Sequence, residues 1–103
     1  MQTTLKSNLS FDGTGLHSGA DVTVVLRPAA AGHGIAFRRT DLKGSPVIAA
    51  LWLNVVVSPL NTRLTNADGV TVSTIEHLMA ALAGCGVHNV MIDIDGTEVP
   101  CLD

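Results

Sequence analysis

The stretch Ser73–Val87, STIEHLMAALAGCGV, is the one segment of this sequence that reads clearly as a helix. Its apolar side chains recur at spacings of three, four and seven residues, which aligns them in one stripe along a helix. The stripe consists of Ile75, Leu78, Met79 and Leu82. One side of the helix is therefore expected to pack against a core.

Both ends of this helix carry signals of their own. Ser73 and Glu76 match a capping box, in which each side chain accepts a hydrogen bond from a free backbone N–H of the first turn. Gly84 and Gly86 predict the end, because glycine readily takes the left-handed conformation that closes helices. The helix is therefore expected to begin close to Ser73 and to end before Val87.

The helix also carries two adjacent residues equipped for chemistry, Glu76 and His77. In one interpretation Glu76 is only a capping residue and His77 is a partly buried helix histidine. In the other, the imidazole is a zinc ligand and the carboxylate is a general base for a zinc-bound water. Ala80 and Ala81 lie on the side of the histidine, where small side chains let another backbone or a ligand approach. One histidine does not decide between the two, because a catalytic zinc needs about three protein ligands.

Composition limits the class of protein. The 103 residues make one small domain, with 47% hydrophobic and only 3% aromatic residues, so the core must consist of Val, Leu, Ile and Ala. A formal charge of −3 and scattered Lys and Arg residues argue against nucleic-acid binding. No apolar run is long enough to span a bilayer and no signal sequence is recognisable, which predicts a cytoplasmic protein. Cys85 and Cys101 are then expected to be free thiols.

Alternating or continuous apolar residues predict strands on both sides of the helix. The residues from Asn66 to Gly69 contain an Asp-Gly turn and predict a hairpin that leads directly into the helix. The expected strands are residues 3–11, 21–27, 35–39, 46–53 with 55–57 as a continuation, 62–65, 70–73 and 90–94.

These elements predict an α+β fold, a single two-layer domain over residues 1–103. A mostly antiparallel sheet of about five strands packs on one main helix, and a second short helix remains open. One face of such a sheet stays uncovered, because a domain needs two packed layers around its core. The chain is therefore expected to be part of something larger, or to associate with itself through this face.

Several polar residues lie outside the helix. The loop 12–19, DGTGLHSG, places His17 among glycines, where it is either accessible to a ligand or hydrogen-bonded to its own loop. The pair Arg38 and Arg39 ends a strand and is interpreted as solvated. Asp93 and Asp95 alternate with apolar residues and are interpreted as solvated on the outer face of a strand.

Taken together, these segments resemble one family. They are GTGLHSG (13–19), RRTDL (38–42), Thr62-Arg63-Leu64 and above all VSTIEHLMAALAGCGVHNVMIDIDGTEVPCLD (72–103). They look like the amino-terminal half of the UDP-3-O-acyl-N-acetylglucosamine deacetylases, the zinc amidases of lipid A biosynthesis in Gram-negative bacteria. The resemblance runs over nearly the whole chain, and the STxEHLxAALxGxGxxN block followed by PxxD is its specific part. It favours the interpretation of Glu76 and His77 as residues of a functional site.

The resemblance implies a larger fold, in which two similar α/β domains pack with their helices sandwiched between their sheets. The active site lies where the domains meet. His77 matches the zinc ligand of the first domain, and a histidine and an aspartate of an HxxxD motif in the second domain supply the others. Glu76 matches the general base that activates the zinc-bound water, so that the N-acetyl group of UDP-3-O-acyl-N-acetylglucosamine is removed.

The resemblance also assigns residues around this centre. Asp103 matches an aspartate that supports the site from behind the metal ligands, and His17 matches a histidine close to the substrate. The positions Leu60, Asn61 and Thr62 correspond to a segment that borders the acyl end of the pocket.

No HxxxD motif is expected among the 103 residues, so the second-domain ligands are expected outside this chain, and none of His17, His33 and His88 is assigned as a substitute. The chain alone is therefore expected neither to hold catalytic zinc tightly nor to deacetylate, and its expected partner is the carboxy-terminal domain of the same enzyme. The alternative is a non-catalytic binding or assembly domain that kept the fold. Retention of both Glu76 and His77 favours the enzyme, because a binding module has no need of that pair.

Overall fold

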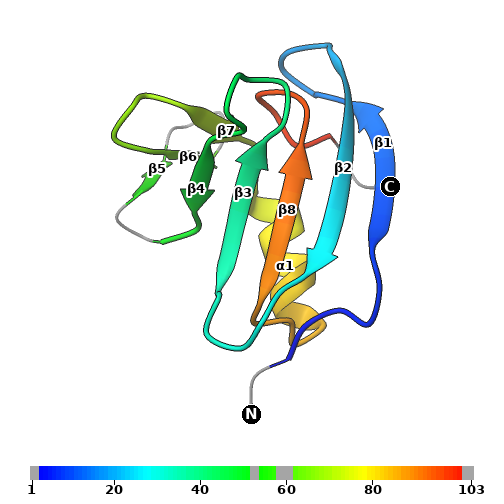
Figure 1. Ribbon diagram of the computed structural model, residues 1–103. Helices are drawn as coiled ribbons and strands as arrows, with labels where there is room; N and C mark the ends of the chain where they lie inside the picture. Colours follow the sequence, from blue (N-terminus) through cyan, green and yellow to red (C-terminus); the bar gives the residue numbers. More distant parts are fainter. Residues whose placement is uncertain (1–2, 52–53, 58–61, 101–103) are drawn as a thin grey trace.

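The computed structural model describes residues 3–51, 54–57 and 62–100. Within these residues a five-stranded sheet has the strand order β1-β2-β8-β3-β4, and a three-stranded sheet has the order β5-β6-β7 (Figure 1). The elements are β1 (Leu9–Thr14), β2 (Asp21–Pro28), β3 (Ile35–Arg39), β4 (Val47–Ala49), β5 (Val55–Val57), β6 (Thr62–Thr65), β7 (Thr71–Ser73), α1 (Glu76–Gly84) and β8 (Val90–Ile94). Neighbouring strands are antiparallel except β3 and β8, which are parallel. The predicted α+β class with a mostly antiparallel sheet is confirmed.

The core lies between one face of the five-stranded sheet and α1, which crosses behind that sheet in Figure 1. The central strand β8 is paired so that Ile92 lies opposite Leu26 of β2 on one side and Phe37 of β3 on the other. The helix contributes the predicted stripe, of which Leu78 is 2% exposed and Met79 is partly buried. The core is therefore aliphatic, as the composition predicts, with Phe37 as a fully buried aromatic ring.

The helix begins later than the sequence suggests, and the predicted capping box is wrong. Ser73 is part of β7, where its backbone N–H donates to Thr97 and its backbone oxygen accepts from Val99. Its hydroxyl donates to the Thr97 oxygen at 3.2 Å, and Ile75 is the N-cap without a side-chain cap hydrogen bond. The Ser73 hydroxyl is thus directed by strand pairing, which a local motif does not anticipate.

The end of the helix follows the glycine signal. Gly86 has a φ of +71°, its N–H donates to the oxygen of Ala83 at 3.1 Å, and the N–H of Val87 donates to that of Leu82 at 3.0 Å. These two bonds are those of a Schellman motif, which satisfies the free carbonyls of the last turn. The left-handed conformation of Gly86 is therefore part of the helix stop.

Two strand predictions need correction. The first strand does not start at residue 3 but at Leu9, and it continues through Gly13 into the predicted loop because Gly13 pairs with Val22. Within residues 46–51 of the apolar run, the structure has the short strand β4. Residues 55–57 do not continue it, since β5 pairs with β6 in the second sheet. Residues 52–53 of that run lie outside the described part.

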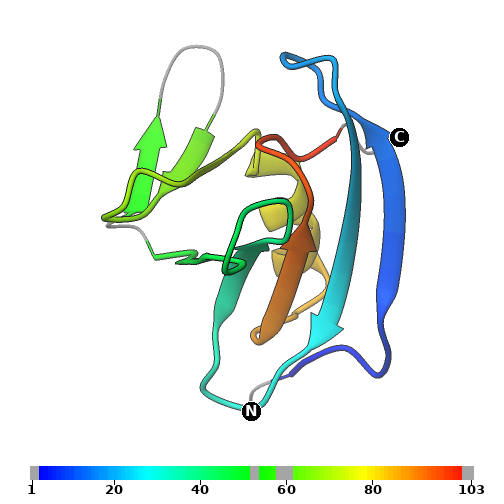
Figure 2. The same ribbon diagram turned by 45° about the horizontal axis from the view of Figure 1, so that its top comes forward.

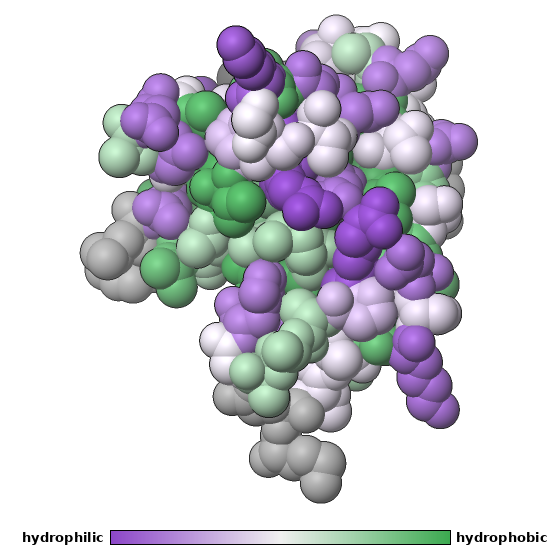
Figure 3. Space-filling view, in the orientation of Figure 1, coloured by the Kyte–Doolittle hydropathy of each residue, from purple (hydrophilic) through white to green (hydrophobic). Residues whose placement is uncertain are grey.

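The face of the five-stranded sheet that is turned away from α1 carries a cluster of charges. Nε of Arg27 lies 2.6 Å from Oδ2 of Asp93, and Nε of Arg38 lies 2.6 Å from Oδ1 of the same carboxylate. Figure 3 shows hydrophilic side chains over the middle of this face. Asp93 is only 6% exposed, so its interpretation as a solvated carboxylate is wrong. The strand register explains why both arginines reach Asp93. Arg38 lies directly opposite Asp93, and Arg27 lies opposite Met91, two residues before Asp93 in β8.

Arg39 is likewise not solvated. It is 4% exposed, and its guanidinium donates to both carboxylate oxygens of Asp41, at 2.8 and 2.6 Å. Nη1 also donates to the backbone oxygen of Thr71 at 2.8 Å. Arg39 therefore ties β3 of the large sheet to β7 of the small one, and with it to the segment that leads into α1.

Candidate functional site

Glu76 and His77 are the first two residues of α1. Ile75 and Leu78 on either side of them are buried, which turns the inner side of the helix toward the sheet. His77 is exposed on the outer side, where Ala80 and Ala81 are exposed as well. The interpretation of His77 as a partly buried helix histidine is therefore wrong, and its imidazole is open to a ligand from outside the chain.

The carboxylate of Glu76 is held by the second sheet. The backbone N–H of Thr62 donates to Oε2 of Glu76 at 2.9 Å, and the backbone oxygen of Thr62 accepts from the N–H of Ile75 at 3.2 Å. The first residue of β6 thus fixes both the side chain and the backbone at the start of α1. A carboxylate that accepts an N–H through one oxygen keeps acceptor capacity on the other, here Oε1.

A second group of residues surrounds Glu98, a residue that the sequence analysis did not assign. Glu98 is 2% exposed and its carboxylate accepts hydrogen bonds from the backbone N–H groups of His17 and Ser18, at 3.0 and 2.8 Å. Oε2 also accepts the hydroxyl of Thr74 at 2.8 Å. Burial raises the pKa of Glu98, but the hydrogen bonds from Ser18, Thr74 and His17 outweigh burial and leave that pKa below its ordinary value.

The glycines of the His17 loop are needed for this arrangement. A Cβ at Gly15 would collide with Oε1 of Glu98 and with the hydroxyl of Ser18. Gly19 has a φ of +69° and its N–H donates to the oxygen of Gly15 at 3.0 Å, which closes the loop. The loop therefore lies directly on the buried carboxylate, and only a residue without a side chain fits at Gly15.

Thr74 has a φ of +58°, which is unusual for a residue with a branched side chain. Such a conformation costs on the order of 1–3 kcal/mol and persists only where the surroundings hold it. The hydroxyl of Thr74 is held by Glu98, and Thr74 lies two residues before Glu76. Thr74 thus lies between the Glu98 carboxylate, which contacts the His17 loop, and the start of α1.

Of the seven predicted site residues, four are described and three lie outside the described part of the chain. Thr62, Glu76 and His77 come together at the start of α1. The backbone of His17 reaches that end of the helix through Glu98 and Thr74, and Figure 2 shows the β1–β2 loop and the segment after β8 at the same end of the molecule. The residues outside the described part are Leu60, Asn61 and Asp103.

A complete metal site is not found among the described residues, which hold no group of three or more His, Cys, Asp and Glu side chains suited to bind an ion. His17 and Asp21 do have the HxxxD spacing, so the expectation that the sequence holds no such motif is wrong. They lie in a loop and at the start of β2, and Oδ1 of Asp21 accepts the hydroxyl of Thr14 at 3.0 Å. A single exposed imidazole such as His77 fits the role of one zinc ligand, with the others supplied from elsewhere.

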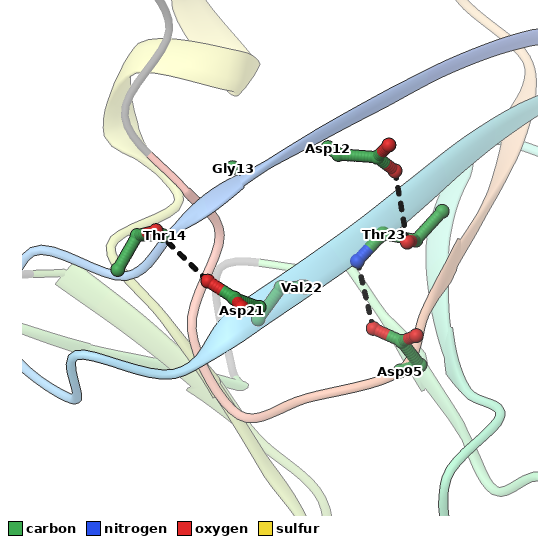
Figure 4. Close-up of a pocket in the computed structure, with 7 residues that line it drawn as sticks. All are labelled: Asp12, Gly13, Thr14, Asp21, Val22, Thr23 and Asp95. Carbon is green, nitrogen blue, oxygen red and sulfur yellow. Dashed lines mark hydrogen bonds between the residues drawn. The ribbon is translucent and has the colours of Figure 1, made fainter.

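A separate hollow of about 510 Å³ lies between β1 and β2 (Figure 4). It holds none of the predicted site residues, and its carboxylates are already bonded to neighbouring groups. Oδ1 of Asp12 accepts the hydroxyl of Thr23 at 2.9 Å, and Oδ1 of Asp95 accepts the Thr23 N–H at 2.8 Å. Among the described residues, no helix has the length and apolar character needed to cross a membrane.

Comparison with known proteins identifies the family. A model of the family described as UDP-3-O-acyl N-acetylglycosamine deacetylase matches residues 2–103. The chain is 55% identical over 102 residues to the UDP-3-O-acyl-N-acetylglucosamine deacetylase of Myxococcus xanthus, with 99% of this chain and 32% of that protein covered. The enzymes of the same name from Geobacter sp. strain M21 and Photobacterium profundum are 52% and 51% identical, and 33% and 34% of their lengths are covered. The chain thus belongs to the UDP-3-O-acyl N-acetylglycosamine deacetylase family and spans about a third of the length of the curated relatives that it matches.

Proposed function

We propose that this chain is the amino-terminal part of a zinc-dependent hydrolase that removes the N-acetyl group from UDP-3-O-acyl-N-acetylglucosamine in lipid A biosynthesis. The observation that carries the proposal is that two adjacent residues at the start of α1 are suited to this chemistry. His77 has an exposed imidazole, and the carboxylate of Glu76 accepts a hydrogen bond from the backbone N–H of Thr62. The names of the relatives support this choice of substrate. The proposed location is the cytoplasm, where thiols stay reduced, and Cys85 is a free cysteine.

His77 is suited to hold the metal from this side of the site. Its ring is exposed on the outer side of α1, while the buried side of the helix fixes the backbone that carries it. Zinc bound there would polarise the amide carbonyl of the substrate and lower the pKa of water to about 7. The remaining ligands would come from the carboxy-terminal domain of the same enzyme. That domain would pack on the outer side of α1, where Ala80 and Ala81 permit close approach.

Glu76 is suited to act as the general base. The Thr62 N–H fixes its Oε2, so that the carboxylate has one orientation and Oε1 is the oxygen that receives a proton from the attacking water. The fixed orientation matters, because a general base has to lie within hydrogen-bond reach of the proton it removes. The C–N bond then breaks, the sugar nitrogen takes a proton from a general acid of the carboxy-terminal domain, and acetate and the free 2-amino sugar are released.

The test replaces the matching third of the Myxococcus xanthus deacetylase by this chain and measures release of acetate from UDP-3-O-acyl-N-acetylglucosamine, with the parent enzyme as the positive control. We expect the hybrid to be active, and His77→Ala and Glu76→Ala to lower kcat/KM at least about a thousandfold, since each removes a group in contact with the reacting atoms. His33→Ala is the matched control, because this exposed histidine lies in the β2–β3 loop, with Nδ1 3.0 Å from the oxygen of Gly34.

Two results would contradict the proposal. A folded hybrid without activity at any zinc concentration would favour the alternative, a non-catalytic binding or assembly domain that kept the fold. A His77→Ala hybrid that still turns over at the parental rate would remove the assignment of the metal ligand, whatever the activity of the unsubstituted hybrid.

A further inference from the structure

We propose that Glu98 is a positioning residue of this site: its buried carboxylate fixes the His17 loop against the turn that starts α1, and so sets where His17 meets the substrate. The inference rests on the proposed function for the role of His17. The anchoring of the loop by Glu98 stands on the contacts of this chain alone.

Three hydrogen-bond donors surround the carboxylate of Glu98. Glu98 receives the N–H of His17, the N–H of Ser18 and the hydroxyl of Thr74, all within 3.0 Å. An ionised carboxylate is an acceptor at both oxygens and matches such a set of donors. The environment is therefore built for a charged acceptor and not merely for a side chain of this size.

The other backbone hydrogen bonds of the loop are local. The N–H of Gly15 donates to Ala20 at 2.9 Å, and the N–H of Gly19 donates to Gly15 at 3.0 Å. Both bonds close the loop on itself. The bonds from His17 and Ser18 to Glu98 are of another kind, because they join the loop to the segment that follows β8.

Glu98 also contacts the turn that leads into α1, at the end of the helix that carries Glu76 and His77. Thr74, which donates to Glu98, has a left-handed backbone and lies two residues before Glu76. One carboxylate thus contacts both the loop that carries His17 and the turn from which α1 begins. Errors of about 1 Å in the placement of groups around a substrate cost on the order of a hundredfold in rate. A shared anchor keeps the two segments in one geometry.

The test uses Glu98→Gln, which keeps the size of the side chain but replaces one acceptor oxygen by an NH₂ donor. In this chain, hydrogen–deuterium exchange of the His17 and Ser18 amides, followed by NMR, is expected to accelerate at least about tenfold. Asp68→Asn, an exposed carboxylate-to-amide change in the β6–β7 turn, is the matched control and should leave both rates unchanged. Unchanged rates in Glu98→Gln would overturn the proposal.

A second variant tests the same contact without removing the charge. Gly15→Ala places a methyl group against both the Glu98 carboxylate and the Ser18 hydroxyl that lies beside it, and should accelerate the same two amides. A Cβ at Gly84 meets no atom within 4 Å, so Gly84→Ala should not. If Glu98→Gln does not fold, Gly15→Ala alone decides, and protection of both amides as in the unsubstituted chain overturns the proposal.

The catalytic part is tested in the active hybrid by a double-substitution cycle. Glu98→Gln is expected to lower kcat/KM about ten- to a hundredfold at unchanged zinc content, and His17→Ala combined with it should cost no more than the larger single effect, because Glu98 acts through His17. Losses that multiply would refute the action through His17. An inactive unsubstituted hybrid would refute the proposed function and with it the catalytic role, while the exchange rates still decide the anchoring.

Discussion

Replacing Asp93 by asparagine is expected to destabilise the protein, because it takes the negative charge out of the cluster on the open face of the large sheet. The Asp93 side chain is 7% exposed, and it accepts from Arg27 at 2.6 Å and from Arg38 at 2.6 and 2.9 Å. Asparagine is nearly the same size as aspartate, so the substitution changes the charge and one acceptor group but hardly the packing volume. The two guanidiniums would then face each other across β8 without a counter-charge.

The magnitude follows from the exposure of the three partners. Removing one member of a fully buried ion pair costs on the order of 3–5 kcal/mol, whereas exposed pairs contribute about 0–1 kcal/mol. Here the carboxylate is buried, but Arg27 and Arg38 are 42% and 36% exposed, so water screens their charges. We therefore expect a loss of about 1–2 kcal/mol in the free energy of unfolding, between the two limits.

The same cluster predicts a dependence on pH. Burial raises the pKa of Asp93, but the hydrogen bonds and charges of Arg38 and Arg27 outweigh burial and leave that pKa below its ordinary value of 3.8. A carboxyl group whose pKa is lower in the folded state stabilises the protein above its unfolded pKa, and this contribution is lost as the pH falls through the folded pKa. The stability of the unsubstituted chain should therefore fall below about pH 4, and more steeply than that of Asp93→Asn.

Urea unfolding followed by circular dichroism at about pH 7 and at steps down to about pH 2.5 measures both effects. Asp68→Asn, in an exposed turn, controls for the loss of one negative charge and should change the free energy of unfolding by less than about 0.5 kcal/mol. The reasoning would be refuted if Asp93→Asn were as stable as the Asp68→Asn control at neutral pH, or if its acid limb ran parallel to that of the unsubstituted chain.

Three further results are expected. Leu78→Ala removes a side chain that is 2% exposed between α1 and the sheet and should cost about 2–4 kcal/mol in urea unfolding, with values below about 1 kcal/mol arguing against this core. Gly86→Ala, at a φ of +71°, should cost about 1 kcal/mol in the same assay, whereas Gly84→Ala should be neutral or stabilising, and equal effects would count against the Schellman stop. Chelation of zinc should abolish acetate release by the hybrid but leave the unfolding of this chain unchanged, because His77 is its one proposed ligand; a shift in its unfolding midpoint would point to a metal site within the chain.

The sequence predicts those parts of the fold that depend on neighbours along the chain. The strands 35–39 and 90–94 have the predicted bounds, since alternation and flanking turn residues are local signals. The apolar stripe and the glycine stop of α1 are local as well, and both are confirmed. The hairpin from β6 to β7 follows from its Asp-Gly turn, where Gly69 has a φ of +79°.

The errors have a common cause, which is pairing between distant segments. The capping box failed because strand contacts from Thr97 and Val99 occupy Ser73. The solvated interpretation of Asp93 failed because the register of three strands brings two arginines onto it, and no window along the sequence contains all three. Glu98 lies in the short segment after β8, and its partners in the loop 15–19 are distant along the sequence. No local pattern therefore predicts this contact.

The candidate site was predicted mainly from resemblance. The residues alone leave Glu76 and His77 undecided between cap and catalyst. The exposed ring of His77 contradicts a partly buried helix histidine, and the role of both residues stays a prediction. The backbone N–H of Thr62 donates to Glu76, a contact that the sequence does not predict. For all seven site residues the functional assignments stay predictions, and Leu60, Asn61 and Asp103 lie outside the described part of the chain.

The position of β8 in the middle of the large sheet affects how the chain folds while the ribosome makes it. β8 separates β2 from β3, and the ion pairs that it makes with them join residues 66 and 55 positions apart. The ribosome therefore releases both flanking strands well before the strand that fits between them exists, and the two cannot pair with each other in the native order. Until residues 90–94 emerge, the edges of β2 and β3 that pair with β8 have no partner. Because an unpaired strand edge can pair with another chain, this is the period in which a chaperone would protect the nascent chain from aggregation.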